Sequence, residues 1–372
     1  MKKIKLCLIV SELKSGGVES FIINYFKKID KSKYRLFIMT HNKPNKKISK
    51  TFTELGFKIL YVPPKKKNII KSLYCINKYM KKYKFDIVHS NLFKTNFIYL
   101  MIAKKNNVKL RIAHSHNSEY KFKVLNNLLY FFIHKLNLKY ANYYIGCSNK
   151  ALLYGFGNKV FYTNRYKVLY NAINVNEYKF NKSKREKIRK DLNIKDNEIL
   201  LCNIGRFTKQ KNHIFLINMF NKLNKINKNY KLLLIGDGIL KDNIRLLINE
   251  YNLEKNIIIL DSFSDVKDYY SAMDIFLLPS LYEGMPLVIV ESLSNGLKVI
   301  SSKCFNKKEI NESIIDINLD EELWVESIFN INKEYKRINK IKNTKYDIDI
   351  AYKDLEKIYG ELKNEKSREI NK

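Results

Sequence analysis

Short runs of β-branched and other apolar residues alternate with helical patterns along almost the whole chain of 372 residues. This alternation is typical of βαβ units built on a parallel sheet. The fold class predicted is therefore α/β, with two Rossmann-like, doubly wound domains that face each other across a cleft. The predicted strands of the first series are Ile4–Val10, Arg35–Thr40, Lys58–Val62, Asp86–Ser90, Leu110–His114 and Tyr143–Cys147; those of the second are Ile199–Ile204, Lys231–Ile235, Ile257–Leu260, Ile275–Leu278 and Lys298–Ser301.

The polar stretch Asn176–Asp196 separates the two series and predicts where one domain gives way to the next. We expect an N-terminal domain over residues 1–175 and a C-terminal domain over residues 176–345. The remaining residues, 346–372, read as a charged helix and tail that could pack back on the first domain. Doubly wound domains bind their ligands at the carboxyl ends of the strands, so the sites are expected there.

Charge is distributed unevenly along the chain. The total of 70 Lys and Arg against 36 Asp and Glu gives a formal net charge of +34. Residues 1–176 hold 35 basic and 6 acidic residues, a difference of +29, and the rest of the chain holds 35 and 30, a difference of +5. A strongly basic first half indicates an anionic partner. Nucleic acid is a remote alternative, since the chain contains no groove-reading motif, RNP sequence or zinc finger.

The cysteines and the N-terminus predict the compartment. The 5 cysteines are scattered without a C-x-x-C pair, which favours reduced thiols in a cytosolic protein. The apolar run Leu6–Val10 is too short for a signal peptide. No run approaches the length of a membrane span. We expect a cytoplasmic protein that is soluble or peripheral on the inner face of the membrane.

A pair of glycines, Gly16 and Gly17, follows the first predicted strand and precedes a helix. Glycines in this position let the backbone approach a phosphate closely and present amides at a helix N-terminus. The spacing is not G-x-G-x-x-G, so a bound dinucleotide is not indicated. A simple tight turn remains the alternative reading.

A second cluster follows the first strand of the second series and reads Gly205-Arg206-x4-Lys211-Asn212. The planar guanidinium of Arg206 and the ammonium of Lys211 would converge at the end of a strand, an arrangement that suits a diphosphate. Most lysines in such a chain are solvated, so Arg206 is the more informative of the two.

The third cluster contains two glutamates, Glu283 and Glu291, on either side of a predicted helix start. Pro286 suits the first helical position, where its missing N–H is not needed. The amides of Leu287 and Val288 would then form an anion site at the positive end of the helix. Two carboxylates so placed can hold hydroxyl groups on either side of a diphosphate. The alternative is that both are ordinary surface glutamates.

In this order and spacing, the three clusters resemble the retaining glycosyltransferases of the GT-B fold, family 4 (group 1). The resemblance extends over nearly the whole chain, and the segment Arg111–Asn117, RIAHSHN, is similar to the subgroup that builds capsular and other exopolysaccharides. It implies transfer of a sugar, with retention, from a nucleotide sugar (a UDP-sugar preferred) to a lipid-linked saccharide or other glycan acceptor. An epimerase of the same fold is the alternative enzyme.

The resemblance also implies a role for each matched residue. Arg206 and Lys211 would neutralise the diphosphate, Glu283 would bind the transferred sugar, and Glu291 would hold the ribose hydroxyls. His116 would be the active-site histidine, bonded to a sugar hydroxyl or a phosphate oxygen. The predicted catalytic residues are His116, Arg206, Lys211 and Glu283; the predicted donor-binding residues are Gly16, Gly17, Gly205, Gly284, Met285, Pro286, Leu287, Val288 and Glu291.

No cofactor or metal is expected. His-x-His, at His114 and His116, can bind zinc, but no nearby cysteine or carboxylate completes a ligand set. His89 and His114 are interpreted as residues of the cleft wall or as hydrogen-bonded histidines at strand ends.

The predicted helix at residues 122–138 carries an apolar face flanked by lysines. Such a helix can lie in a membrane interface, or it can pack its apolar face into the core of the domain. An anionic membrane surface and a lipid-linked acceptor are therefore expected partners, and nucleic acid is not. The apolar face predicted comprises Val124, Leu125, Leu128, Leu129, Phe132 and Leu136, widened by Phe131 and Ile133.

Overall fold

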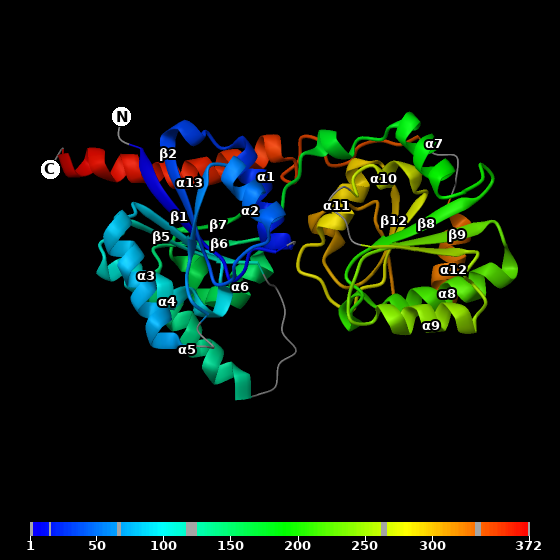
Figure 1. Ribbon diagram of the computed structural model, residues 1–372, viewed down its shortest axis with the longest axis horizontal. Helices are drawn as coiled ribbons and strands as arrows, with labels where there is room; N and C mark the ends of the chain where they lie inside the picture. The colour runs from blue at the N-terminus through cyan, green and yellow to red at the C-terminus, as the bar shows by residue number, and fades with distance from the viewer. Residues whose placement is uncertain are drawn as a thin grey trace. The chain divides into compact units, whose positions relative to one another are not determined.

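The computed structural model describes residues 3–14, 16–64, 68–116, 125–261, 266–331 and 336–370, and it divides the chain into two compact units (Figure 1). The N-terminal unit comprises residues 1–172 and 348–372, and the C-terminal unit comprises residues 173–347. The boundaries expected from the sequence, after residues 175 and 345, differ from these by three and two residues. The final helix belongs to the N-terminal unit.

The N-terminal unit is built on a parallel sheet with the strand order β3-β2-β1-β4-β5-β6-β7. The chain moves outward in one direction from β1 to β3 and in the other from β4 to β7. The switch point therefore lies between β1 and β4, where ligands bind in open α/β sheets. The strands are β1 Ile4–Ile9, β2 Tyr34–Thr40, β3 Phe57–Tyr61, β4 Ile87–Ser90, β5 Leu110–Ser115, β6 Tyr143–Gly146 and β7 Tyr166–Val168.

Helices cover both faces of this sheet, because alternate side chains of each buried strand point to opposite faces. In β1, Leu6 and Leu8 join the core beneath α1 and α13, whereas Cys7 and Ile9 join the core beneath α3, α4 and α6. The helices of this unit are α1 Gly17–Lys28, α2 Lys46–Glu54, α3 Ile69–Tyr83, α4 Asn96–Lys105, α5 Leu125–Tyr140, α6 Asn149–Phe156 and α13 Ile348–Ile370.

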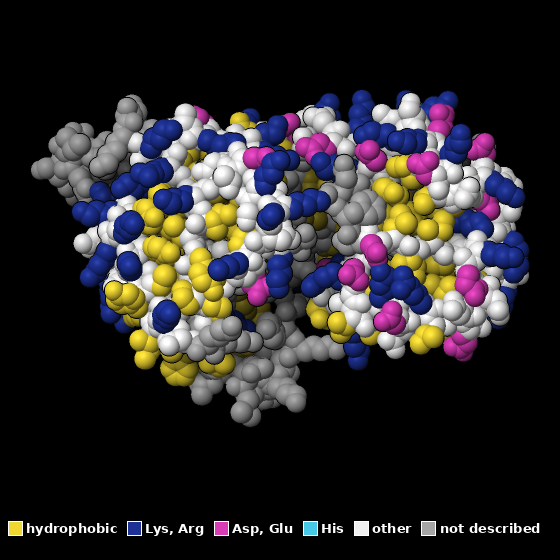
Figure 2. Space-filling view, in the orientation of Figure 1, with side chains coloured by type: hydrophobic (Ala, Val, Ile, Leu, Met, Phe, Trp, Pro, Cys, Tyr) yellow, Lys and Arg dark blue, Asp and Glu magenta, His cyan; other side chains and the backbone are white. Residues whose placement is uncertain are grey.

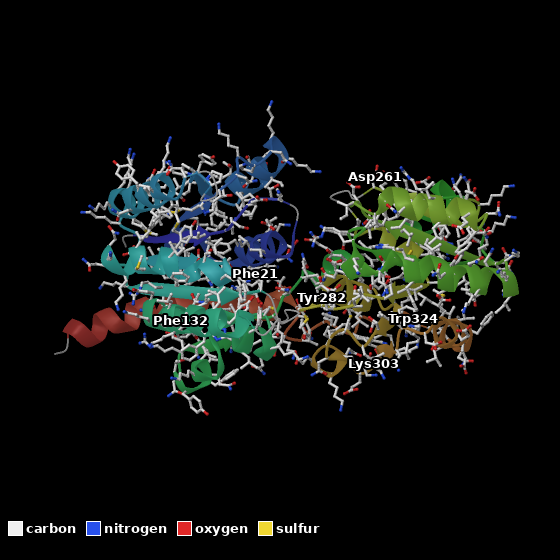
Figure 3. The ribbon with its side chains drawn as sticks, turned by 90° about the horizontal axis from the view of Figure 1, so that it is seen from below. Phe21, Phe132, Asp261, Tyr282, Lys303 and Trp324 are labelled. Carbon is white, nitrogen blue, oxygen red and sulfur yellow. The ribbon has the colours of Figure 1, made fainter. Side chains whose placement is uncertain are left out.

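The C-terminal unit repeats the same plan with the strand order β10-β9-β8-β11-β12-β13 and a switch point between β8 and β11. Trp324 of α12 is fully buried in its core and lies inside this unit in Figure 3. The strands are β8 Ile199–Ile204, β9 Tyr230–Ile235, β10 Ile257–Leu260, β11 Ile275–Leu278, β12 Lys298–Ser302 and β13 Ile315–Ile317; the helices are α7 Lys182–Asp191, α8 His213–Ile226, α9 Lys241–Glu250, α10 Tyr269–Ala272, α11 Leu287–Ser294 and α12 Glu321–Asn330. Two doubly wound units confirm the predicted α/β fold class.

Several elements were not predicted. The stretch 176–196, interpreted as a polar connection, contains α7, whose sequence offers almost no apolar periodicity. Charge holds this helix in place instead: Arg185 and Arg189 contact the two carboxylate oxygens of Asp274 at 2.6 and 3.0 Å. Helices α2, α6 and α12 and the three-residue strands β7 and β13 were also missed.

The helix α5 buries only part of the apolar face expected from the sequence. Tyr130, Ile133 and Asn137 are buried, whereas Leu129, Phe131 and Phe132 are 54%, 58% and 52% exposed. Much of the apolar face predicted for this helix is thus on the surface, where Figure 3 shows Phe132. Val124 and the side chains of Leu125 and Leu128 lie outside the described residues. Among the described helices, none has both the length and the apolar character needed to cross a bilayer.

The two units differ in net charge, as the two halves of the sequence do. Residues 348–372 contain 6 basic and 6 acidic residues, so the N-terminal unit keeps its excess of +29. Acidic side chains of α13 pair with lysines of this unit, Asp349 with Lys28 and Asp354 with Lys167. Figure 2 shows Lys and Arg side chains spread over the visible face of the N-terminal unit, with few acidic ones between them.

A substitution at Leu355 of α13 tests the packing of this last helix on the N-terminal unit, because the Leu355 side chain is fully buried there. We expect Leu355→Ala to lower the free energy of unfolding by about 2–5 kcal/mol, as for other buried leucines. Ile350 of the same helix is 43% exposed, and Ile350→Ala should change it by no more than about 0.5 kcal/mol. Circular dichroism would follow the unfolding in urea. The fluorescence of Trp324, the only tryptophan, should report the C-terminal unit separately. Equal midpoints for the two variants would contradict this packing.

Candidate active site

The loops after β8 and β11 meet at the carboxyl edge of the C-terminal sheet. The two strands are hydrogen-bonded neighbours, so their parallel direction brings both loops to one place. Direct contacts then join the loops: the Leu281 amide donates to the Gln210 carbonyl at 2.8 Å, and the Gln210 side chain donates to the Tyr282 carbonyl at 2.9 Å. Residues some seventy positions apart are thereby held together.

Lys211 and Glu283 form an ion pair between these loops. Lys211 Nζ lies 2.6 Å from Glu283 Oε1, and the two side chains are only 15% and 9% exposed. A Cβ atom on Gly205 would lie 3.3 Å from the Lys211 side chain, so glycine leaves room for the lysine to cross the loop. The sequence predicted both residues for the site but not their contact.

The Arg206 side chain is exposed, and its guanidinium forms no hydrogen bond or ion pair with any residue that the structure describes. It follows Gly205 directly, so it stands beside the Lys211–Glu283 pair on the same loop. The planar guanidinium can donate two parallel hydrogen bonds to an oxyanion. The loop thus offers a positive group that is not already neutralised by a neighbour within the described chain.

Two further glycines support this loop from below. A Cβ on Gly236 would come within 1.9 Å of the Gly205 carbonyl oxygen, and Gly238 adopts a φ of +158° against the backbone of Phe207. The Phe207 amide donates to the Asp237 carbonyl at 3.0 Å. The Gly236-Asp237-Gly238 turn therefore forms the support on which the Gly205–Phe207 loop rests, and larger side chains would displace it.

The helix α11 begins at Leu287, with Pro286 as the residue that precedes the first turn. This places the proline one position earlier than predicted. The first amides of a helix have no acceptor within it, so those of Leu287 and Val288 are available to an anion. The Glu283 amide donates to the Cys304 carbonyl at 3.2 Å, which fixes the segment Glu283–Met285 ahead of the helix.

Glu291 lies one turn into α11, where two tyrosines hold its carboxylate. Tyr178 donates to Oε1 at 3.0 Å, and Tyr270 donates to Oε2. Burial raises the pKa of Glu291 above its ordinary value, although both hydroxyl donors and the charge of Lys267 act in the opposite direction. The carboxylate is oriented before any ligand arrives.

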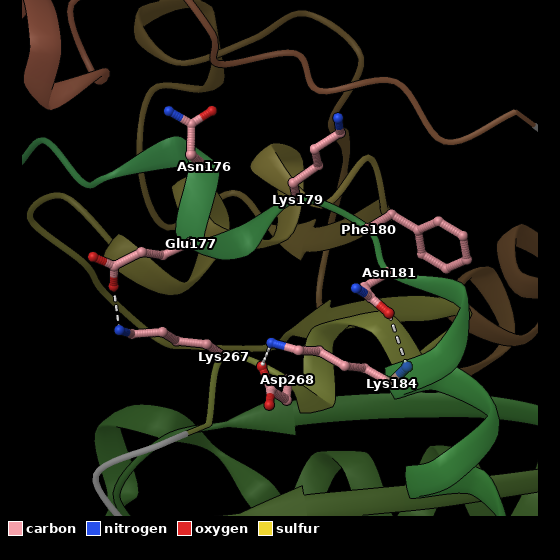
Figure 4. A pocket seen from close by; sticks show the side chains of 8 residues that line it. All are labelled: Asn176, Glu177, Lys179, Phe180, Asn181, Lys184, Lys267 and Asp268. Atoms are coloured by element: carbon pink, nitrogen blue, oxygen red, sulfur yellow. Dashed lines mark hydrogen bonds and ion pairs between the residues drawn. The ribbon is translucent and has the colours of Figure 1, made fainter.

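A polar cavity of about 400 Å³ opens next to these tyrosines (Figure 4). Two ion pairs cross it, Glu177 with Lys267 and Lys184 with Asp268. None of the residues predicted from the sequence lines this cavity, which lies between the segment before α7 and the start of α10. The lining residues are Asn176, Glu177, Lys179, Phe180, Asn181, Lys184, Lys267 and Asp268.

In the N-terminal unit, Gly16 and Gly17 stand between β1 and α1, and His116 follows β5. Gly16 has extended backbone, so no left-handed conformation requires glycine there. A Cβ on Gly17 would meet nothing within 4 Å, and one on Gly16 would meet only the end of the Glu19 side chain. The space at Gly17 is therefore open, as a close approach of a ligand to this backbone would need.

Three histidines stack in a row across the end of this sheet. The ring centroids of His89 and His114 are 5.2 Å apart, and those of His114 and His116 are 3.9 Å apart. The row continues into α13, where the Tyr359 hydroxyl lies 2.7 Å from His89 Nδ1. Burial lowers the pKa of His89 and of His116 to about 3, and that of His114 well below its ordinary value, so all three rings are neutral.

Among the described residues, no group of three or more His, Cys, Asp or Glu side chains is arranged to hold a metal ion. His89 and His114 are engaged with each other, since His89 Nε2 lies 3.1 Å from His114 Nδ1. Both ring nitrogens of His89 have partners, Tyr359 and His114, as expected of a hydrogen-bonded histidine at a strand end, whereas the buried Nε2 of His114 has no partner among the described residues.

Comparison with known proteins identifies the family. The model of the family described as Glycosyltransferase Family 4 matches residues 15–177, and the model described as Glycosyl transferases group 1 matches residues 184–345. The chain belongs to the family 4, group 1 glycosyltransferases. The membership of family 4, group 1 inferred from the sequence is confirmed.

Three relatives of this glycosyltransferase illustrate the family. The putative glycosyltransferase EpsF of Bacillus subtilis is 27% identical over 81% of this chain and 79% of its own. The capsular polysaccharide biosynthesis glycosyltransferase CapH of Staphylococcus aureus is 24% identical over 96% of this chain and 98% of its own. The UDP-Gal:alpha-D-GlcNAc-diphosphoundecaprenol alpha-1,3-galactosyltransferase of Escherichia coli is 25% identical over 69% and 70%.

Among solved structures, Anabaena HepE in complex with UDP and glucose matches with a TM-score of 0.78 and 16% identity, covering 96% of this chain and 99% of that one. At this identity the match shows the fold, which is GT-B.

The structure adds residues to the candidate site that sequence reasoning missed. Tyr178 and Tyr270 hold Glu291, Gln210 joins the two loops, and Asn91 contacts His116. Little in the sequence distinguishes these tyrosines, since the chain has 26 of them. The predicted residues fall into two groups. Those from Gly205 to Glu291 lie together at the carboxyl edge of the C-terminal sheet, and Gly16, Gly17 and His116 lie at that of the N-terminal sheet.

The raised pKa of Glu291 predicts how this group affects stability. In strong acid the carboxyl of Glu291 is protonated in both the folded and the unfolded state, so its burial does not remove a charge from water. As pH rises through the ordinary pKa toward the raised one, the unfolded state releases its proton first, and the free energy of unfolding falls. We therefore expect Glu291→Gln to raise the unfolding midpoint at pH 7 relative to wild type, and to do so much less at pH 4. Trp324 fluorescence in urea would measure the midpoint, with Glu250→Gln as an exposed control. A larger effect at pH 4 than at pH 7 would contradict a raised pKa for Glu291.

Proposed function

We propose that this glycosyltransferase transfers a sugar, with retention, from a UDP-sugar to a lipid-linked saccharide in the synthesis of a surface polysaccharide. The observation that carries the proposal is the convergence of Arg206, the Lys211–Glu283 pair and the first turn of α11 at one sheet edge. The names of CapH and of the E. coli galactosyltransferase support the polysaccharide and the diphosphoundecaprenol-linked acceptor. The UDP bound to HepE supports the nucleotide.

The proposed chemistry is electrostatic. Negative charge grows on the nucleoside diphosphate as its bond to the sugar breaks, and preorganised donors placed where that charge develops lower the barrier. We assign this work to Arg206, Lys211 and the amides of Leu287 and Val288, which supply positive charge without a metal ion. Glu283 holds Lys211 in place and accepts hydrogen bonds from the sugar hydroxyls, while Glu291 binds the ribose hydroxyls. The proposed groups stabilise the leaving group, and none acts as a nucleophile. Retention then follows if the acceptor hydroxyl attacks the face of the sugar from which the diphosphate departs.

Removal of either positive side chain tests the assignment. We expect Arg206→Ala and Lys211→Ala each to lower kcat by about 10²-fold or more, as the loss of one preorganised donor does elsewhere. Lys209→Ala is the matched control, since this lysine is exposed on the same loop and should leave kcat unchanged. The assay would measure UDP release and sugar transfer from a panel of UDP- and GDP-sugars to a lipid diphosphate acceptor. Near wild-type turnover in both variants would refute the diphosphate site, and sugar isomerisation without transfer would indicate an epimerase.

We further propose that the N-terminal unit binds the inner face of the cell membrane, where a lipid-linked acceptor is presented. The excess of +29 on this unit suits an anionic leaflet. The exposed Leu129, Phe131 and Phe132 of α5, near Lys135 and Lys139, form an apolar patch with a basic border. A helix of this kind places its apolar side chains among the lipid headgroups while its lysines contact the phosphates.

Sedimentation with vesicles tests this surface. We expect the protein to bind vesicles that contain phosphatidylglycerol in a salt-sensitive manner, at about 1 kcal/mol for each basic residue near the surface. The double variant Phe131→Ser, Phe132→Ser should weaken binding by about tenfold or more, because each phenylalanine contributes buried apolar area. Ile239→Ser, at a residue that is 88% exposed in the C-terminal unit, is the control. Equal, salt-insensitive binding to neutral and anionic vesicles would contradict the proposal.

A further inference from the structure

The imidazole of His116 is held by neighbours from three elements. His114 of β5 stacks on one face with centroids 3.9 Å apart, and Phe21 of α1 meets the ring edge-on at 5.5 Å. Asn91, which follows β4, lies with Oδ1 2.8 Å from His116 Nε2. His116 Nδ1 forms no hydrogen bond with any described residue, so only one of the two ring nitrogens is engaged within the described chain.

The orientation of the Asn91 amide is fixed by its other contacts. Its Nδ2 donates to the His89 carbonyl at 3.4 Å, and its backbone amide donates to the Ile9 carbonyl at 2.8 Å. A flipped amide would set Oδ1 against that carbonyl oxygen, an arrangement of two acceptors with no proton between them. Asn91 is 8% exposed, so water offers little alternative. Oδ1 therefore faces His116, and an amide oxygen can only accept.

We propose that Asn91 is a positioning residue that keeps the proton of His116 on Nε2, so that Nδ1 presents a lone pair to a hydroxyl group of the substrate. This proposal rests on the proposed function, because it requires that a sugar reaches His116. It goes further by naming the group that His116 recognises. An acceptor nitrogen binds a hydroxyl, whereas a phosphate oxygen would need a donor in the same place.

The groups around His116 keep it neutral. Burial alone lowers its pKa to about 3. The titratable groups that face it are His114, itself neutral, and Cys147, which follows β6 and whose Sγ donates to the His116 carbonyl at 3.5 Å; His89 lies behind His114. No carboxylate among the described residues pairs with His116, in contrast to the Asp–His pairs that favour an imidazolium.

Nuclear magnetic resonance of the protein labelled with ¹⁵N-histidine measures the tautomer without substrate. The chain has 6 histidines, and the spectrum of His116→Gln identifies the signal by its loss. We expect the neutral Nε2–H form of His116 between pH 5 and 8 in wild type, and a mixture of tautomers in Asn91→Leu. A wild-type His116 with its proton on Nδ1, or an imidazolium at pH 7, would overturn the proposal. These wild-type measurements hold even if a variant fails to fold.

Activity provides the second readout, through Asn91→Asp. A carboxylate at hydrogen-bond distance raises a histidine pKa by about 1–3 units, so protonation of Nδ1 would enter the assay range and remove the acceptor. We expect kcat/KM of Asn91→Asp to rise by up to about tenfold from pH 5 to pH 8, a limb absent from wild type and from Asn91→Ala. The control Asn137→Asp places a carboxylate at a buried asparagine of the same unit, and it should show no such limb. Identical profiles for Asn91→Asp and wild type in measurements extended down to pH 4 would overturn the role.

The two proposals fail in different ways. If wild type transfers no sugar from any donor in the panel, the proposed function is wrong, and the tautomer is still decided by the spectrum. If wild type is active but the spectrum shows an imidazolium, the assignment of Asn91 is wrong and the transferase stands.

Discussion

In the C-terminal sheet, β8 and β11 are adjacent parallel strands although some seventy residues separate them in sequence. Their hydrogen-bond ladder fixes the relative height of the two loops that follow, and the ion pair of Lys211 and Glu283 depends on that height. The same register brings Gln210 to Leu281 and Tyr282, in the loop that leads to α11. A shift of one residue between the strands would reverse which side chains face each helical layer, so packing of the core holds the site in register.

Two carboxylates of this unit, Asp274 and Glu291, are each oriented by a set of hydrogen-bond donors. Asp274 receives Arg185 and Arg189 together with the Leu200 amide, and Glu291 receives the hydroxyls of two tyrosines. A buried carboxylate without such donors would be costly. The difference lies in the donors: Asp274 is paired with two arginines, whereas Glu291 receives hydrogen bonds from two uncharged hydroxyls.

The sequence could predict features that depend on a local pattern, but not those that depend on tertiary contacts. Strand positions such as Ile199–Ile204 followed from apolar runs, and the glutamates at 283 and 291 followed from their spacing around a helix start. The sequence left open whether the apolar face of α5 is buried, because positions 129, 132 and 136 share a period with 130, 133 and 137, and only contact with α4 and α6 decides which set is buried. Tyr178 and Asn91 were missed because their partners lie 113 and 25 residues away.

The last helix shows why position in the sequence does not determine membership of a unit. α13 follows the C-terminal unit in the chain, yet it inserts Leu355 and Tyr359 into the N-terminal core. Its acidic side chains pair with lysines of that unit and its own lysines balance them, so the helix docks without reducing the positive excess of the unit. Through the Tyr359 hydroxyl the same helix reaches His89 and so the row of histidines that ends at His116. A change in how α13 docks would therefore reach His116 through the imidazoles of His89 and His114, which makes the docking of this helix a condition for the position of the His116 ring.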